Sequence, residues 1–273
     1  MAELLTVPEI KNHKIVNSRE WTTARKELLR KEKELTHLRD ELSRQRRDLP
    51  WEKVEKKYAF EGRNGKETLP DLFQGRSQLI IYHFMFGPGW KEGCVGCSFL
   101  ADHLDGAVQH LEHHDVSFVV VSRAPFDEIE AFHKRMGWKF KWVSSYGSDF
   151  NYDYHVSFKK DSGKVYYNFE EQDFQIEESS GTSVFYRDPM DNMFHTYSSY
   201  ARGGDIFLGA YNYLDITPKG RNENGPNYSL ADWVRHHDRY ENGGFVQSTG
   251  RFVAKADSSC RCDSEQVNNT GRK

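Results

Sequence analysis

The sequence has few cysteines and lacks any long hydrophobic segment. Only 4 cysteines occur among 273 residues, too few for a disulfide framework in a chain of this length, so we expect a reducing, cytoplasmic location. The longest apolar runs are QLIIYHFMF and VSFVVV, far short of the roughly 20 residues that a membrane-spanning helix needs. The N-terminal residues are interrupted by charges and Pro8 and contain no apolar core of a secretory signal. We therefore expect no membrane partner.

The sequence also lacks an excess of charge of either sign. Its 38 basic and 41 acidic side chains give a formal charge of −3, without the basic surplus that favours nucleic acid as a partner. No nucleic-acid partner is expected. Hydrophobic residues make up 37% of the chain, enough for one substantial core. The composition predicts an N-terminal helical extension (1–50), one main domain (51–243) and a mobile C-terminal tail (244–273) with little to bury.

Residues 17–47 are predicted to form one long helix. The segment has no Gly or Pro and is dense in Lys, Arg, Glu and Leu, which favour helices. Asn17 and Glu20 resemble a capping box at its start. An apolar residue recurs every seven positions, at Trp21, Leu28, Leu35 and Leu42. Two interpretations stay open, a helix that lies on its own domain and a homodimer seam of coiled-coil type.

Strand and helix patterns alternate in the main domain. Three apolar segments predict strands, namely QLIIYHFMF, VSFVVVS and WKFKWVSS. Two amphipathic segments between them predict helices, namely SFLADHLDGAVQHLEHH and FDEIEAFHKRMG. This alternation predicts crossover connections and parallel pairing. Turn signals predict hairpins at Asn64-Gly65 and around residues 188–192, the second antiparallel at the sheet edge, and YSLADWVRHHDRYEN predicts a closing helix.

A cysteine pair in GWKEGCVGCSFLAD lies between the first of these strands and the first helix. Cys94 comes at the start of the helix and Cys97 in its first turn, where unpaired backbone N–H groups stabilise an anion. A thiolate held there has a lowered pKa and attacks disulfides. Cys94 is then the nucleophile and Cys97 the resolving thiol. Metal ligation and inert packing of two small residues are the alternatives to this redox interpretation.

Four segments in combination resemble the DUF899 family, namely SQLIIYHFMFGPGWKEGCVGCSFLAD, FHTYSSYARG, LDITPKGR and WVRHHDRYE. This resemblance implies an α/β, thioredoxin-like fold, a mixed central sheet flanked by helices, here preceded by the long N-terminal helical extension. The family is described as predicted dithiol-disulfide oxidoreductases, which implies an active-site dithiol at Cys94 and Cys97. The expected substrate is a small-molecule or protein disulfide, and no bound cofactor is expected.

Two departures from thioredoxin-like relatives bear on substrate binding. Thioredoxins hold substrate against a cis-proline before the strand that faces the dithiol, whereas the corresponding segment here, SSGTSVFYR, offers Thr182 and Ser183 but no proline. These two residues, with Trp90 and Arg123, are our candidate substrate-binding residues. Neither cysteine satisfies the Pro-x-x-x-Thr/Ser-x-x-Cys pattern of peroxiredoxins.

Arg123 and several aromatic residues are expected near the dithiol. Arg123 should end the second strand, at the edge where parallel sheets carry their sites, and could stabilise a thiolate or bind an acidic substrate group. A surface ion pair is the alternative. The aromatic candidates for a pocket are Tyr82, Trp90, Tyr197 and Tyr200, with core packing as the alternative for each.

The 12 histidines support the metal alternative. His83 lies on the strand that leads to Cys94, while His155 and His195 lie in aromatic segments. One such imidazole with Cys94 and Cys97 would suit copper or, with a fourth ligand, zinc. For each histidine, a hydrogen-bonded place in the core is the alternative.

Two further pairs occur near the C-terminal end of the sequence. His236 and His237 fall at the end of a predicted helix, where a cation is favoured, and are expected at the surface. Cys260 and Cys262 lie in the predicted tail. They could resolve a disulfide of the main site, bind metal, or be incidental.

Overall fold

The computed structural model describes residues 13–160, 163–173, 176–221, 223, 230–240, 244–246 and 252–254. Cys260 and Cys262, with most of the predicted tail, lie outside these residues. Among the described helices, none combines the length and the apolar character that crossing a bilayer requires.

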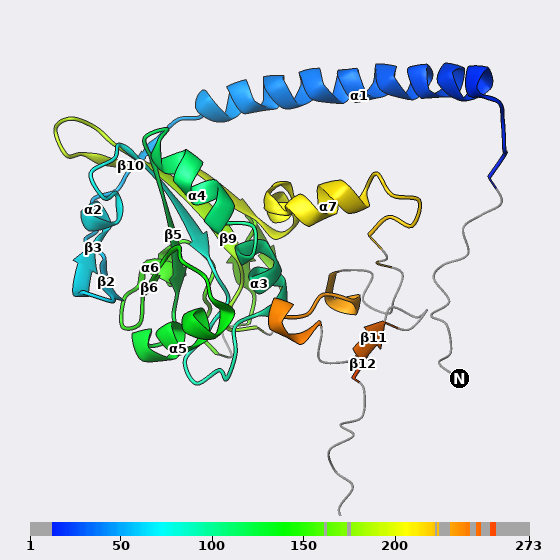
Figure 1. Ribbon diagram of the computed structural model, residues 1–273. Coiled ribbons are helices and arrows are strands. Elements are labelled where there is room, and N and C mark those ends of the chain that lie inside the picture. Colours follow the sequence, from blue (N-terminus) through cyan, green and yellow to red (C-terminus); the bar gives the residue numbers. More distant parts are fainter. Residues whose placement is uncertain are drawn as a thin grey trace, which may run out of the picture.

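The N-terminal helix α1 (Ser18–Arg47) forms where the sequence predicts it. Asn17 caps it by accepting a hydrogen bond from the backbone N–H of Glu20 (3.0 Å). No residue of α1 is buried, and Figure 1 shows the helix running as a rod apart from the sheet. Its apolar stripe is open, with Leu28 52% and Leu35 57% exposed. The interpretation of a helix that lies on its own domain is therefore wrong.

A mixed sheet of eight strands forms the centre of the domain. Its strands are β1 (Glu52–Lys53), β2 (Ala59–Gly62), β3 (Gly65–Thr68), β4 (Gln78–His83), β5 (Val116–Ser122), β6 (Lys141–Ser144), β9 (Gly181–Arg187) and β10 (Met193–Tyr200). They follow the order β1-β10-β9-β4-β5-β6-β2-β3. Two small hairpins lie outside this sheet, β7 (Val165–Tyr167) with β8 (Glu170–Gln172) and β11 (Gly244–Val246) with β12 (Phe252–Ala254).

The strand directions are those of a thioredoxin-like fold. β4, β5 and β6 pair in parallel, as the alternation of strands and helices predicts. β9 pairs antiparallel with β4 on its other side and with β10, so the second predicted hairpin extends the sheet beyond β4. The first predicted hairpin joins β2 and β3, and Gly65, the first residue of β3 after the turn, has φ +97°, which glycine adopts without strain. The expected fold class is confirmed.

Helices cover both faces of the sheet. They are α2 (Leu69–Leu72), α3 (Val95–Ala101), α4 (Asp105–Glu112), α5 (Phe126–Met136), α6 (Phe150–Asp153) and α7 (Gly209–Leu214), with 3-10 turns η1 (Ala201–Phe207), η2 (Leu230–Asp232) and η3 (His237–Arg239). α3 and α5 pack on the same side as Tyr82 and Val120. α2 and α6 pack on the opposite side with Ile81 and Val121. Because successive residues of a strand alternate between faces, β4 and β5 carry apolar residues on both of their faces.

Two predicted helices differ from the structure. The first is divided into α3 and α4, and the carboxylates of Asp102 and Asp105 at this break accept hydrogen bonds from the Trp138 indole (2.8 Å) and the Phe140 N–H (2.9 Å). The predicted closing helix is wrong, because its described part, residues 230–240, consists of η2, an extended stretch and η3. Burial of Val234 and His236 outweighs helix propensity there.

Candidate functional site

The cysteine pair lies where β4 leads into α3. Cys94 is the residue that precedes the first turn of α3, and Cys97 lies within it. The backbone N–H of Cys94 donates to the Met85 carbonyl (3.0 Å), and the Met85 N–H donates to the Cys97 sulfur (3.4 Å). These two bonds hold the loop after β4 against the start of the helix. Cys94 remains half-buried while Cys97 is only 3% exposed.

The two thiols have different pKa values because their surroundings differ. The Cys97 thiol and the backbone N–H groups of Cys97 and Gly96 donate to the Cys94 sulfur and, against the opposing effect of burial, lower the pKa of Cys94 to about 7. Burial, followed by the neighbouring Cys94, raises the pKa of Cys97. The Tyr82 hydroxyl also donates to Cys97. Cys94 is therefore the sulfur that ionises first, and Cys97 stays a protonated donor beside it.

Gly93 gives the loop its close approach to the core. A Cβ atom at this position would lie 2.5 Å from a ring carbon of Phe84 and 2.9 Å from one of Phe132. A side chain there would push the loop and Cys94 away from the core. The carbonyl of Gly93 accepts a hydrogen bond from Nε2 of His236 (3.0 Å). The close packing of the loop against Phe84 and Phe132 therefore requires glycine at position 93.

A cavity of about 430 Å³ opens beside the dithiol. Both cysteines line it, together with Tyr82 on β4 and Thr182 on β9. The end of β10, the turn η1 and four residues near the C-terminal end, Leu230, Ala231, Val234 and Arg235, also line it. A volume of this size is suited to a small organic molecule.

We name residues 230–240 the roof segment, and four of them, Leu230, Ala231, Val234 and Arg235, line the cavity. Leu230 lies against Gly96. A Cβ added at Gly96 would lie 3.0 Å from Cδ1 of Leu230. The Trp233 ring packs edge-on against Phe99 at 5.5 Å, and Val234 is fully buried. The roof segment therefore packs directly on α3, the helix that carries the cysteines.

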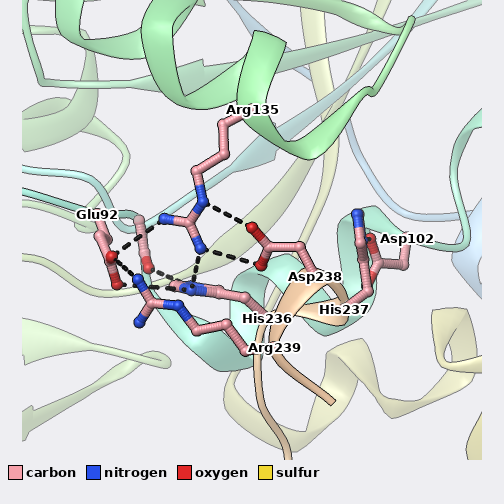
Figure 2. A network of polar contacts seen from close by, with 8 residues as sticks. Glu92, Asp102, Arg135, His236, His237, Asp238 and Arg239 are labelled. Atoms are coloured by element: carbon pink, nitrogen blue, oxygen red, sulfur yellow. Dashed lines mark hydrogen bonds and ion pairs between the residues drawn. The ribbon is translucent and has the colours of Figure 1, made fainter. Parts of the chain in front are cut away.

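A network of polar contacts joins the roof segment to the loop between β4 and Cys94, which we call the cysteine loop (Figure 2). Arg135 on α5 donates to Asp238 (2.8 and 3.0 Å) and to Glu92 (3.0 Å), two residues before Cys94. Arg239 also donates to Glu92. These groups are partly exposed, so each pair alone contributes little. Together with the buried bond from His236 to Gly93, they connect three segments that are distant in the sequence.

The candidate substrate-binding residues fall at different places. Thr182 lines the cavity. The Ser183 hydroxyl instead bonds to Ser198 (2.9 Å) on the face of β9 away from the cysteines. Arg123 donates to the buried carboxylate of Glu178 (2.6 Å), and Trp90, which is 39% exposed, lies by Gly87 close to the same glutamate. Neither Arg123 nor Trp90 is among the described residues that line the cavity.

The candidate metal-ligating histidines lie away from the cysteines. His83 follows Tyr82 in β4 and so points to the opposite face, where its Nε2 bonds to the Ser183 hydroxyl (2.9 Å) and its ring stacks on Tyr154. His195 also contacts the Tyr154 ring, and His155 contacts Tyr166. Within the described part of the chain, no three His, Cys, Asp or Glu side chains are grouped so as to hold a metal ion.

Several residues of the site differ from what the sequence indicates. His236, expected at the surface, is 2% exposed, and no local pattern marks it because a distant loop buries it. Of the aromatic candidates, Tyr82 and Tyr200 line the cavity, whereas Tyr197 is not among its lining residues. The alternation of strand residues could have assigned Tyr82 and His83 to opposite faces.

A family comparison agrees with the resemblance found in the sequence. The sequence profile of the family described as "Bacterial protein of unknown function (DUF899)" matches residues 10–240. No curated protein matches the chain.

Solved structures of similar architecture include two bacterial proteins. The bacterioferritin comigratory protein of Xanthomonas campestris is 14% identical, with 60% of this chain and 96% of that chain covered and a TM-score of 0.40. Peroxidoxin BcpB of Mycobacterium tuberculosis is 13% identical, with 61% and 97% covered and a TM-score of 0.39. Similarity this distant carries no conclusion about chemistry.

Proposed function

This chain belongs to the DUF899 family, and we propose that it is a thiol-disulfide oxidoreductase with Cys94 as nucleophile and Cys97 as resolving thiol. One observation carries the proposal. The Cys94 sulfur receives three donors at the start of α3, which lower its pKa to about 7, and it borders a cavity of about 430 Å³. At neutral pH a large fraction of Cys94 is thiolate, the form that attacks disulfides.

The reaction proceeds in two exchanges. The Cys94 thiolate attacks one sulfur of a substrate disulfide, a bond forms between the two sulfurs, and the other substrate sulfur leaves as a thiolate. Cys97 then attacks Cys94, its proton passes to the departing sulfur, and the second substrate thiol is released. The protein dithiol is oxidised to a disulfide and the substrate is reduced to two thiols. An external dithiol returns the protein to its reduced form.

The surrounding residues have distinct roles in this proposal. Tyr82 donates to the Cys97 sulfur and would stabilise the thiolate that forms there during the second exchange. Thr182 lies on the cavity wall and is the candidate for substrate contact. Ser183, Trp90 and Arg123 stay predictions as substrate-binding residues, and the contacts of the Ser183 and Arg123 side chains favour structural roles.

Trapping the mixed disulfide tests the proposal. All variants carry Cys260→Ser and Cys262→Ser, so that the C-terminal thiols cannot interfere. Protein treated with bis(2-hydroxyethyl) disulfide should form an internal Cys94–Cys97 disulfide, and Cys97→Ser should accumulate a mixed disulfide on Cys94, both identified by mass spectrometry. Cys94→Ser should not react. A mixed disulfide that accumulates on Cys97 instead, or unaltered turnover in Cys97→Ser, would reject the scheme.

The metal-binding alternative has weaker support. Copper or zinc would need ligands besides the two sulfurs, and the histidines considered for that role contact Ser183, Tyr154 and Tyr166 instead. Elemental analysis of untagged protein checks this alternative directly. The absence of a bound cofactor and the cytoplasmic location stay predictions.

A further inference from the structure

The roof segment restricts what can reach the dithiol. Leu230, Ala231 and Val234 line the cavity together with Cys94, and Cys94 is only partly exposed. To reach Cys94, a disulfide of a folded protein would have to enter the cavity together with the backbone that flanks both of its cysteines. A small disulfide needs room for only two short substituents.

The roof segment is held in place by polar contacts to three other parts of the chain. His236 is bonded to the Gly93 carbonyl, and Arg135 joins Asp238 to Glu92 (Figure 2). His237 is bonded to Asp102 at the end of α3 (2.6 Å). The roof segment is therefore attached both before and after the cysteine pair.

The walls of the cavity are mainly apolar. Val95 and Leu100 come from α3, Leu208 follows η1, and Leu230 and Val234 come from the roof segment.

The two charged residues on the wall are already engaged. The Asp205 carboxylate accepts hydrogen bonds from Arg202 (3.0 Å) and Arg221 (3.1 Å). The Arg235 guanidinium donates to the Val234 carbonyl (2.5 Å). Substituents of a bound molecule therefore meet hydrocarbon more than charge.

We propose that the substrate is a low-molecular-weight disulfide with apolar substituents, and not a protein disulfide. This inference rests on the proposed function, because it concerns the molecule that Cys94 attacks. The exchange is the one given above, in which the substrate disulfide is reduced to two thiols and the Cys94–Cys97 dithiol becomes a disulfide. The apolar substituents lie against Leu100, Leu208 and Val234 during the first attack.

A matched pair of small disulfides tests the apolar preference. Dipropyl disulfide and bis(2-hydroxyethyl) disulfide have chains of equal length and differ by a methyl group in place of each hydroxyl. The second-order rate constant for oxidation of the reduced protein is measured in a single turnover, and each value is divided by that of free dithiothreitol with the same disulfide. Burial of the two methyl groups should make the normalised rate constant for dipropyl disulfide roughly tenfold higher than that for bis(2-hydroxyethyl) disulfide. Insulin, as the protein disulfide, should react more slowly than either.

A pair of glycine variants tests whether the cavity is responsible. A Cβ at Gly204 would lie 3.7 Å from Cδ1 of Leu100, an ordinary contact, so Gly204→Leu places a side chain in the cavity. A Cβ at Gly106 on α4 would meet nothing within 4 Å, and Gly106→Leu is the control. Gly204→Leu should lower the rate constant for oxidation by dipropyl disulfide at least about tenfold and leave the pKa of Cys94 unchanged. Gly106→Leu should change neither the rate constant nor the pKa. Leu230→Ala, which opens the roof segment, should reduce the preference for dipropyl disulfide over insulin.

The possible failures are distinguishable. If insulin oxidises the protein as fast as dipropyl disulfide, or if Gly204→Leu and Leu230→Ala both leave the rates unchanged, the substrate inference is wrong while the proposed function stands. If no disulfide forms the Cys94–Cys97 bond, the proposed function fails, and the substrate inference fails with it.

Discussion

The ring of His236 donates a hydrogen bond to the carbonyl of Gly93, the residue before Cys94 (3.0 Å). With Nε2 protonated, Nδ1 accepts from Arg135 (3.4 Å). His236 and Gly93 are 143 residues apart in the chain, so this bond joins two distant segments at the site. It also gives a hydrogen-bond donor to a carbonyl group that lies outside any strand or helix.

Replacement of His236 should destabilise the protein more than replacement of its neighbour. His236→Ala removes the donor to Gly93 from a buried site and should lower the free energy of unfolding by roughly 1–3 kcal/mol. His237→Ala is the control, because the side chain of His237 is 40% exposed and its bond to Asp102 should contribute less than about 1 kcal/mol. Urea denaturation measures both. Equal losses would contradict a special role for the buried ring.

Removal of the Cys97 thiol should raise the pKa of Cys94. The hydrogen bond from Cys97 is the largest cause of the lowered pKa of Cys94, so Cys97→Ala should move it from about 7 toward the ordinary value of about 8.5. The pH profile of alkylation of Cys94 by iodoacetamide gives the pKa. Ser98→Ala serves as the control, because the Ser98 hydroxyl donates to the Cys94 carbonyl (2.9 Å) and not to its sulfur. A profile that stays the same in Cys97→Ala would show that backbone donors alone hold the thiolate.

The buried His83 should make the folded protein sensitive to acid. Burial lowers the pKa of His83 to about 3, whereas the unfolded chain has a value of about 6.5. Between these values the unfolded state binds a proton that the folded state does not, so stability falls as the pH decreases below about 6.5, by up to roughly 1.4 kcal/mol per pH unit. His83→Asn should reduce this slope, while His114→Asn, at an exposed position, should not. Denaturation curves from pH 7 to pH 5 measure the slope.

Arg123 should act on stability through Glu178. The Glu178 side chain is 1% exposed and pairs with Arg123, which is 17% exposed. Arg123→Ala leaves this carboxylate buried with only Ser157 as a side-chain hydrogen-bond partner among the described residues, and should cost roughly 3–5 kcal/mol. Arg187→Ala, whose partner Asp191 is 75% exposed, should cost less than about 1 kcal/mol. If Arg123→Ala keeps full stability and instead weakens substrate binding, the role suggested by the sequence is the correct one.

The exposed stripe of α1 should join two copies of the chain. Its apolar residues repeat every seven positions over a helix of 30 residues, the pattern of a self-complementary coiled-coil seam. Leu28→Glu with Leu35→Glu should convert a dimer to a monomer, as read by sedimentation equilibrium. Lys26→Glu with Lys33→Glu, on the far side of the helix, is the control. A monomeric unmodified protein would refute the dimer.

Local patterns predicted most of the regular elements. Helix α1 and strand β5 lie where composition and apolar runs place them, because each depends on residues close in sequence. The C-x-x-C pair was found in the same way, since its position between a strand and a helix is a local feature. The roof segment was mispredicted as a helix, because the contacts that hold it come from Glu92, Arg135 and Phe99, which are distant in sequence.

The sequence by itself determined that Cys94 and Cys97 stand three residues apart at the start of a helix after a buried strand, because helix and strand periods are local. Only the tertiary structure decided which distant segments meet at the two sulfurs. It placed the Tyr82 hydroxyl against Cys97 and brought His236 onto Gly93. These placements follow from strand pairing and burial across the whole domain, which no short stretch of sequence contains.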